Sequence, residues 1–575
     1  MEAVAEKTVE ADQKVTISGS EAVIRSLKEE GVKLIFGYPG GAIMPIYDAL
    51  FDHGESINHV LTRHEQGAIH AAQGYARATG DVGIVFATSG PGATNLITGI
   101  ADAMIDSTPL VCITGQVISP LLGTDAFQET DVVGISMPVT KWNHQVTCAE
   151  DIPDTIAKAF YIARSGRPGP VVIDITKDAQ INSLDYKYTP CKQIRSYHPM
   201  PALDKEKLQE AADLINNAER PYLLMGQGVL LSGAEKELRD LVEKTGIPAA
   251  WTLLGLSAMP TDHPLNVGML GMHGNYGPNL MTNQCDVLIA VGMRFDDRVT
   301  GKVSEYAKNA KVIHLEIDPS EIDKIIHADV PVLGDAKASL KALLPLVEEK
   351  THEEWLNRFR ECDKLEYEKV IREELNPTKE IMTMGEVIRT LFEKTTNNPI
   401  IVTDVGQHQM VTCRYSKFAK SKSSITSGGL GTMGFCLPAA IGAKLGKPDR
   451  TVVAVIGDGG FQMTIQELGT IFQTKVDIKI MILNNHFLGM VRQWQQLFFD
   501  KRYSATEMDN PDFQTIAKGY GIASKKVDKR EDLAGAVEEM LSHEGSYLLE
   551  VSVGKENNVF PMVPAGCSVS DIRLE

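Results

Sequence analysis

The sequence lacks the features that mark secreted, membrane-spanning and nucleic-acid-binding proteins. Its 8 cysteines include no C-x-x-C pair, which favours reduced thiols in a cytosolic protein. No apolar run is long enough to cross a membrane, and the stretch MEAVAEKTVEADQK has neither a signal-peptide core nor transit-peptide character. A formal net charge of −18 argues against nucleic acid as a partner. We therefore expect a cytoplasmic protein that binds neither membranes nor nucleic acid.

What is present is the pattern of a large α/β protein. The chain has 575 residues, 43% of them hydrophobic and 23% charged, and is too long for a single core. Short apolar runs alternate with helical patterns, which predicts doubly wound parallel sheets. The helical patterns include 15–30, with Ser18 or Ser20 as its cap, 93–104 and 463–473. We predict an α/β domain at 1–185, a linker at 186–203, a second α/β domain at 204–345, a helical connector at 346–380 and a third α/β domain at 381–575.

The stretch 452–490 carries the clearest functional signal. The apolar run 452–456 predicts a buried strand, and the run 478–483 predicts a second one after a helical segment. Asp458 follows the first strand and Asn485 the second, so a strand–helix–strand crossover would place both at one edge of a parallel sheet. Oxygen ligands of this kind suit Mg²⁺. An ordinary strand-end turn is the alternative, and the pairing of GDG with NN favours the metal site.

The same arrangement resembles the thiamine diphosphate (ThDP) motif, in which GDG is followed by NN. The resemblance implies that Asp458, the Asn485 side chain and the Phe487 carbonyl hold Mg²⁺. Gly457 and Gly459 would let main-chain N–H groups approach the diphosphate.

Strings along the whole chain resemble the catalytic large subunits of acetohydroxyacid synthase, also called acetolactate synthase. They include YPGGAIMPIYDAL, RHEQGA, ATSGPGATN, GRPGPVVIDITKD, RFDDRVTG, GTMGFCLPAAIGAK and GMVRQWQ. The resemblance implies pyrimidine-binding, FAD-binding and diphosphate-binding domains. It also implies a transferase that decarboxylates pyruvate on ThDP and joins the two-carbon unit to pyruvate or 2-oxobutyrate, giving 2-acetolactate or 2-aceto-2-hydroxybutyrate. This is the first common step of branched-chain amino acid biosynthesis.

Roles for individual residues follow from the resemblance. Glu65 would hydrogen-bond to N1′ of the ThDP aminopyrimidine. Taken alone, the residue could instead have only a capping role at the start of a helix. Residues that match the reaction centre and the substrate channel are Gly41, Phe127, Gln128 and Lys177. Residues that match the ThDP site are Gln407, His408, Met433 and Met463. Met490 and Trp494 lie four residues apart, so they can line one pocket for the second 2-oxoacid, or be two core side chains.

A second group of residues matches FAD-binding positions of the family. They are Arg167, Gly226, Gly228, Thr252, Leu253, His273, Arg294, Arg298, Glu316 and Asp335. The chain lacks a full G-x-G-x-x-G fingerprint, and a lone G-x-G is weak support for a dinucleotide site. Because the overall reaction involves no net redox change, the resemblance implies that FAD is either structural or an inherited relic.

The resemblance also implies partners: 2-oxoacid substrates, a homodimer or tetramer with active sites between subunits, and a separate regulatory small subunit responding to a branched-chain amino acid such as valine. Ile118 stands where many family members carry Pro, which leaves herbicide sensitivity open. Other ThDP enzymes are rival interpretations: a catabolic FAD-independent acetolactate synthase, a pyruvate oxidase or a 2-oxoacid decarboxylase. A flavoprotein oxidoreductase and a non-catalytic homologue are the others.

Overall fold

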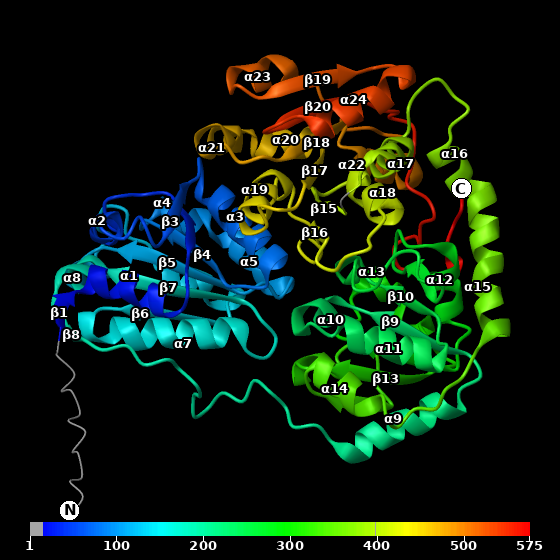
Figure 1. Cartoon of the computed structure of the whole chain (residues 1–575), viewed down its shortest axis with the longest axis horizontal. Helices are drawn as coiled ribbons and strands as arrows, with labels where there is room; N and C mark the ends of the chain where they lie inside the picture. The colour runs from blue at the N-terminus through cyan, green and yellow to red at the C-terminus, as the bar shows by residue number, and fades with distance from the viewer. Residues whose placement is uncertain (1–14, 397) are drawn as a thin grey trace, which may run out of the picture.

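Three parallel β-sheets follow one another along the chain, each with helices packed on its faces (Figure 1). The computed structural model describes residues 15–396 and 398–575. Each sheet has six strands, and the central strands are buried, as expected for parallel strands covered by helices on both sides. The predicted fold class, three α/β domains built on parallel sheets, is confirmed.

The first sheet has the strand order β3-β2-β4-β5-β7-β6. Its strands are β2 (Leu34–Gly37), β3 (Asn58–Leu61), β4 (Gly83–Ala87), β5 (Leu110–Gln116), β6 (Trp142–Val146) and β7 (Pro170–Thr176). The helices are α1 (Gly19–Glu29), α2 (Met44–Phe51), α3 (Glu65–Thr79), α4 (Pro91–Asn95), α5 (Ile97–Ile105), α6 (Val132–Ser136), α7 (Ile152–Arg164) and α8 (Lys177–Ile181). An antiparallel pair, β1 (Val15–Ser18) with β8 (Ser183–Tyr186), joins the two ends of this domain.

The second sheet has the order β11-β10-β9-β12-β13-β14. Its strands are β9 (Pro221–Met225), β10 (Ala249–Trp251), β11 (Asn266–Met269), β12 (Val287–Val291), β13 (Lys311–Glu316) and β14 (Val330–Leu333). The helices are α9 (Lys205–Asn217), α10 (Gln227–Ser232), α11 (Glu235–Thr245), α12 (Tyr276–Thr282), α13 (Asp297–Thr300) and α14 (Ala336–Leu343). A connector follows, made of α15 (Glu353–Glu366), a π-helical turn (Tyr367–Ile371) and α16 (Arg372–Leu375).

The third sheet has the order β16-β15-β17-β18-β20-β19. Its strands are β15 (Ile400–Thr403), β16 (Ser424–Thr426), β17 (Val452–Gly457), β18 (Lys479–Asn484), β19 (Ala523–Val527) and β20 (Tyr547–Ser552). The helices are α17 (Met384–Lys394), α18 (Gln407–Tyr415), α19 (Cys436–Gly446), α20 (Asp458–Met463), α21 (Leu468–Thr474), α22 (Gly489–Phe498), α23 (Phe513–Gly519) and α24 (Arg530–Ser542).

The first and third domains meet where α3 packs against α19, which lie side by side in Figure 1. Glycines allow the close approach: a Cβ added to Gly74 would lie 1.9 Å from the Ala439 carbonyl oxygen, and one added to Gly442 would lie 1.8 Å from that of Ala71. The final residues return to the second domain, where the N–H of Val563 donates to the Met272 carbonyl at 2.8 Å. The third domain thus contacts the first through α19 and the second through the C-terminal residues.

Two predicted helices are interrupted. The helix predicted over 93–104 divides at Leu96 into α4 and α5. The helix predicted over 463–473 is instead the end of α20, a 3₁₀ turn (Ile465–Glu467) and α21. The helix predicted from 15 begins only at Gly19, because β1 occupies Val15–Ser18. Of the two candidate caps, Ser18 and Ser20, it is Ser18 that accepts the N–H of Glu21. Among the described residues, no helix has the length and apolar character needed to span a membrane.

Candidate active site

Asp458 and Asn485 lie at the carboxyl ends of adjacent strands. Strands β17 and β18 pair in parallel with Gly457 opposite Leu483, so the two residues that follow them face one small cavity of about 50 Å³. Phe487 lines the same cavity, and both polar side chains are buried. Burial raises the pKa of the Asp458 carboxyl, which favours a compensating positive charge beside it.

The donor set of this cavity fits a magnesium ion. Residues 15–396 and 398–575 hold no cluster of three His, Cys, Asp or Glu side chains that could bind a metal. An ion here would therefore rely on one carboxylate, the Asn485 carboxamide and the Phe487 carbonyl, with the rest of its shell from phosphate or water. Asn510 was not predicted. Its Nδ2 donates to Asp458 Oδ2 at 2.7 Å and fixes the carboxylate. It lies outside any regular element, and its sequence surroundings contain no motif.

Gly457 and His408 form the part of the cavity suited to a phosphate group. A Cβ added to Gly457 would lie 2.8 Å from His408 Nδ1, so only glycine leaves the approach open. His408, in the first turn of α18, is buried, and its Nε2 has no hydrogen-bond partner among the residues described. Burial lowers the pKa of His408 to about 3, so the ring is neutral and one nitrogen carries a proton to donate. Gln407 also lines the cavity and donates to Gln493 Oε1 at 2.9 Å.

Met433 lies between this cavity and a larger one. Asp404, at the end of β15, accepts the N–H groups of Gly434 and Cys436 at 3.0 Å and fixes the backbone that follows Met433. Gly434 has a φ of 88°, which glycine adopts without strain. Met433 lines both cavities, whereas Met463 is 54% exposed and lines neither within the described part of the chain.

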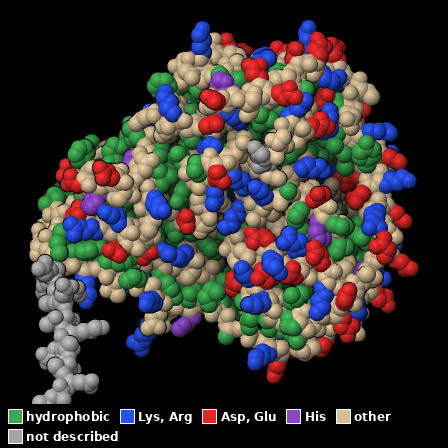
Figure 2. All heavy atoms as spheres, viewed as in Figure 1, with side chains coloured by type: hydrophobic (Ala, Val, Ile, Leu, Met, Phe, Trp, Pro, Cys, Tyr) green, Lys and Arg blue, Asp and Glu red, His purple; other side chains and the backbone are tan. Residues whose placement is uncertain are grey.

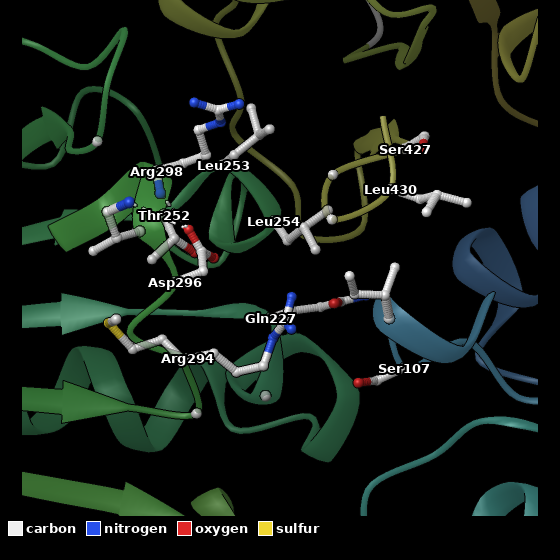
Figure 3. A pocket seen from close by; sticks show the side chains of 18 of the residues that line it. Ser107, Gln227, Thr252, Leu253, Leu254, Arg294, Asp296, Arg298, Ser427 and Leu430 are labelled. Carbon is white, nitrogen blue, oxygen red and sulfur yellow. Dashed lines mark hydrogen bonds between the residues drawn. The ribbon is translucent and has the colours of Figure 1, made fainter. Parts of the chain in front are cut away.

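The larger cavity has a volume of about 770 Å³ and is bounded by all three domains (Figure 3). In the close-up, Ser107 comes from the first domain, Arg294 from the second and Leu430 from the third. The predicted FAD residues that line it are Arg167, Gly228, Thr252, Leu253, His273, Arg294, Arg298, Glu316 and Asp335. Gly226 does not line it but lies behind the wall, where a Cβ would be 2.3 Å from the Gly292 carbonyl oxygen. Met490 and Trp494, on one face of α22, line it too.

Several polar groups line the large cavity. Glu316 ends β13, and burial raises its pKa to about 7. Arg167 donates to Glu321 at 2.8 Å, to Ser107 at 2.9 Å and to Asp318 at 3.2 Å, so its guanidinium is held in place. His273 is buried, and burial lowers its pKa to about 4. A cavity of this size with apolar walls and a few fixed polar groups fits a large organic cofactor.

Glu65 lies in a separate cluster at the carboxyl edge of the first sheet. It is the first residue of α3, is buried, and accepts a hydrogen bond of 3.0 Å from Asn95. Gly41, Gln128, Phe127 and Lys177 follow strands of the same sheet or lie in the loop after β5. Within the described chain, none of these five residues lines either cavity. Phe127 is 88% exposed.

Comparisons with known proteins agree with this arrangement. Three family models match: the N-terminal TPP binding domain of thiamine pyrophosphate enzymes at 17–135, the central domain at 208–343 and the C-terminal TPP binding domain at 404–551. The acetolactate synthase isozyme 2 large subunit of Escherichia coli is 45% identical over 97% of this chain and 99% of its own length. The acetolactate synthase large subunit of Lactococcus lactis is 45% identical over 96% of this chain and 95% of its own. The chain therefore belongs to the thiamine pyrophosphate enzymes and, within them, to the family of acetolactate synthase large subunits.

Proposed function

We propose that the chain is the catalytic subunit of an acetolactate synthase. It would decarboxylate pyruvate and join the remaining two-carbon unit to a second 2-oxoacid, giving 2-acetolactate from pyruvate or 2-aceto-2-hydroxybutyrate from 2-oxobutyrate. The observation that carries the proposal is the meeting of Asp458, Asn485 and Phe487 in one cavity at two adjacent strand ends. The identity to curated large subunits along nearly the whole chain supports the same reaction.

Residues of the small cavity would hold the diphosphate and the metal. Asp458, Asn485 and the Phe487 carbonyl bind Mg²⁺, while His408 and the backbone at Gly457 and Gly459 face the diphosphate. Thiamine diphosphate supplies a thiazolium that stabilises the negative charge left on carbon after CO₂ is lost. Met433, which lines both cavities, would contact the cofactor. Gln407 Oε1 accepts a hydrogen bond of 3.5 Å from Asn485 Nδ2 and so orients that side chain.

FAD would occupy the large cavity. Its lining includes the arginines Arg164, Arg167, Arg294 and Arg298, the acidic residues Asp296, Asp297, Glu316 and Asp335, and a mixture of glycines, neutral polar residues and apolar residues. The reaction needs no net transfer of electrons, so FAD acts there as a structural element.

Glu65 would complete the site of a second subunit. Its carboxylate would hydrogen-bond to the aminopyrimidine of ThDP. In the part of the chain that the structure describes, however, Glu65 lines neither cavity of its own subunit. Hydrophobic side chains are exposed on the first domain, among them Met44 and Phe51 of α2, and Figure 2 shows apolar surface over this domain. These observations support a dimer or tetramer in which Gly41, Phe127, Gln128 and Lys177 of one copy face Met490 and Trp494 of another.

Two further proposals concern the assembly and its parts. The relatives are named large subunits, which supports a separate small subunit with a regulatory role. The predicted boundaries, with a linker at 186–203 and a connector at 346–380, stay a proposal; the six strands of each sheet fall inside one predicted domain.

Product analysis with an omission series tests the function. The purified chain is supplied with pyruvate, ThDP, Mg²⁺ and FAD, and each cofactor is then left out in turn. We expect 2-acetolactate and CO₂ with the full set, and loss of product when any one is missing. Acetyl phosphate or acetaldehyde as the product would assign the chain to another ThDP enzyme. Reduction of the flavin in step with turnover, followed by absorbance, would favour the oxidoreductase.

A further inference from the structure

The turn 427–434 forms part of the wall between the two cavities. Residues 427–431 line the large cavity, and Met433 lines both. Figure 3 shows Ser427 and Leu430 on the third-domain side of the large cavity. Any displacement of this turn would therefore move Met433 relative to the small cavity. What holds the turn decides how well Met433 is placed.

Two carboxylates from the first domain hold the turn at its start. Asp106, which follows α5, accepts the N–H of Gly428 at 2.8 Å and that of Gly429 at 2.7 Å. Asp102, within α5, accepts the hydroxyls of Ser427 and of Thr432, the latter at 2.9 Å. The Ser427 hydroxyl in turn accepts the N–H of Thr432 at 2.8 Å. The far end of the turn is fixed by Asp404, as described above.

The two carboxylates differ in how many of their oxygens accept hydrogen bonds. Both oxygens of Asp106 accept hydrogen bonds, and Arg77 donates to one of them at 2.7 Å. Asp102 uses only Oδ1; its Oδ2 is buried without a partner among the described residues. Burial, together with the neighbouring Asp106 carboxylate, raises the pKa of Asp102 to about 6. An amide could replace Asp102 with its oxygen at Oδ1, but at Asp106 it would turn an NH₂ group toward an N–H donor.

We propose that Asp102 and Asp106 are positioning residues for thiamine diphosphate, holding the turn 427–434 so that Met433 stays in the wall shared by the two cavities. The inference rests on the proposed function, because it takes the small cavity as the ThDP site and the large one as the FAD site. The proposal also links the two sites. Because the turn 427–434 lines both cavities, binding in the large cavity would affect the small cavity through this turn.

The test compares binding of ThDP to folded variants of the full chain, by isothermal titration calorimetry in the presence of Mg²⁺ and FAD. Asp106→Asn is expected to raise the Kd for ThDP by roughly tenfold or more, and to lower the retained flavin, because one of the two backbone N–H donors loses its acceptor and faces the NH₂ group instead. Asp102→Ala is expected to raise the Kd, whereas Asp102→Asn, which keeps the acceptor, rescues most of the affinity. Asp154→Asn, an exposed residue of α7, serves as a control with unchanged Kd.

A milder pair covers the case in which an aspartate variant does not fold. Thr432→Val removes one donor to Asp102, while Thr432→Ser keeps the hydroxyl. We expect Thr432→Val to raise the Kd for ThDP by roughly two- to tenfold and Thr432→Ser to restore it. Unchanged Kd and flavin content in folded Asp106→Asn, or in Thr432→Val, would overturn the proposal. Failure of the proposed function is seen separately, because wild-type chain would then bind no ThDP at all.

Discussion

Asn95 Nδ2 donates a hydrogen bond of 3.0 Å to Oε2 of Glu65 and so fixes the buried carboxylate at the start of α3. The other oxygen, Oε1, faces Gly92, where an added Cβ would lie 3.3 Å away. The carboxylate is thus oriented by its own domain, while the cavity that it is proposed to serve belongs to another subunit.

Replacing Glu65 by Gln tests its role without disturbing the fold. The amide oxygen of Gln can still accept from Asn95, so we expect an unchanged Tm and near-normal ThDP binding. Activity should fall by roughly 10²- to 10⁴-fold, because the amide cannot hold the proton that the reaction moves. Steady-state kinetics measures this, with exposed Glu55→Gln as the matched control. Full activity in Glu65→Gln would support a non-catalytic helix-capping role instead.

Asp458 is expected to control the metal requirement. In Asp458→Asn the only carboxylate among the three predicted ligands is lost, so the Mg²⁺ concentration for half-maximal activity should rise at least about tenfold. Asn510→Ala removes only the 2.7 Å hydrogen bond that fixes the carboxylate, so the Mg²⁺ concentration for half-maximal activity should rise by a smaller factor. A metal titration at fixed ThDP measures both. Equal effects of the two changes would show that Asp458 does not touch the ion.

Trp494 is expected to select the second substrate. The side chain lines the large cavity from α22, one helical turn after Met490. Trp494→Leu should lower the ratio of acetohydroxybutyrate to acetolactate severalfold while leaving pyruvate decarboxylation largely intact, because the pocket for the ethyl group loses its wall. Chromatography of the products from mixed substrates gives the ratio. A variant that loses both products in proportion would point to a core residue.

Glu316 makes stability depend on pH. Burial raises its pKa from 4.5 to about 7, so the folded state holds this proton more tightly than the unfolded chain. The side chain therefore stabilises the fold fully below about pH 4.5, and this contribution, on the order of 3 kcal/mol, is lost as the pH rises through about 7. Between pH 5 and 8 the Tm of flavin-free wild type should fall more than that of Glu316→Gln. Calorimetry measures both Tm values. A larger fall in Tm for Glu316→Gln than for the wild type would contradict this prediction.

The sequence is most informative where structure is local. The apolar runs at β17 and β18, with the glycines and polar residues that follow them, predict the metal cavity directly, because neighbouring parallel strands end at one edge. Strands of three residues such as β10 and β16 carry no such signal; they exist because they pair with β9 and β15. The break at Leu96 likewise leaves no mark in the helical spacing of 93–104.

The large cavity could not be predicted from spacing alone. Its walls come from segments as distant as Ser107, Thr252 and Leu430, and which of them meet is decided by domain packing, including the glycine contacts of α3 with α19. Of these three, resemblance to a family supplied Thr252 alone. The FAD-binding role of Gly226, which lies behind the wall, stays a prediction. Resemblance gave no indication of Asp102 and Asp106, because their role is a contact between two domains.

The most direct test of the central claim is a competition between the two acceptors. The chain, with ThDP, Mg²⁺ and FAD, is given pyruvate and 2-oxobutyrate together, and both products are quantified. We predict acetohydroxybutyrate in clear excess over the share of 2-oxobutyrate in the mixture, with no product when FAD is omitted. Acetolactate alone, formed equally well without FAD, would instead assign the chain to the catabolic type of enzyme.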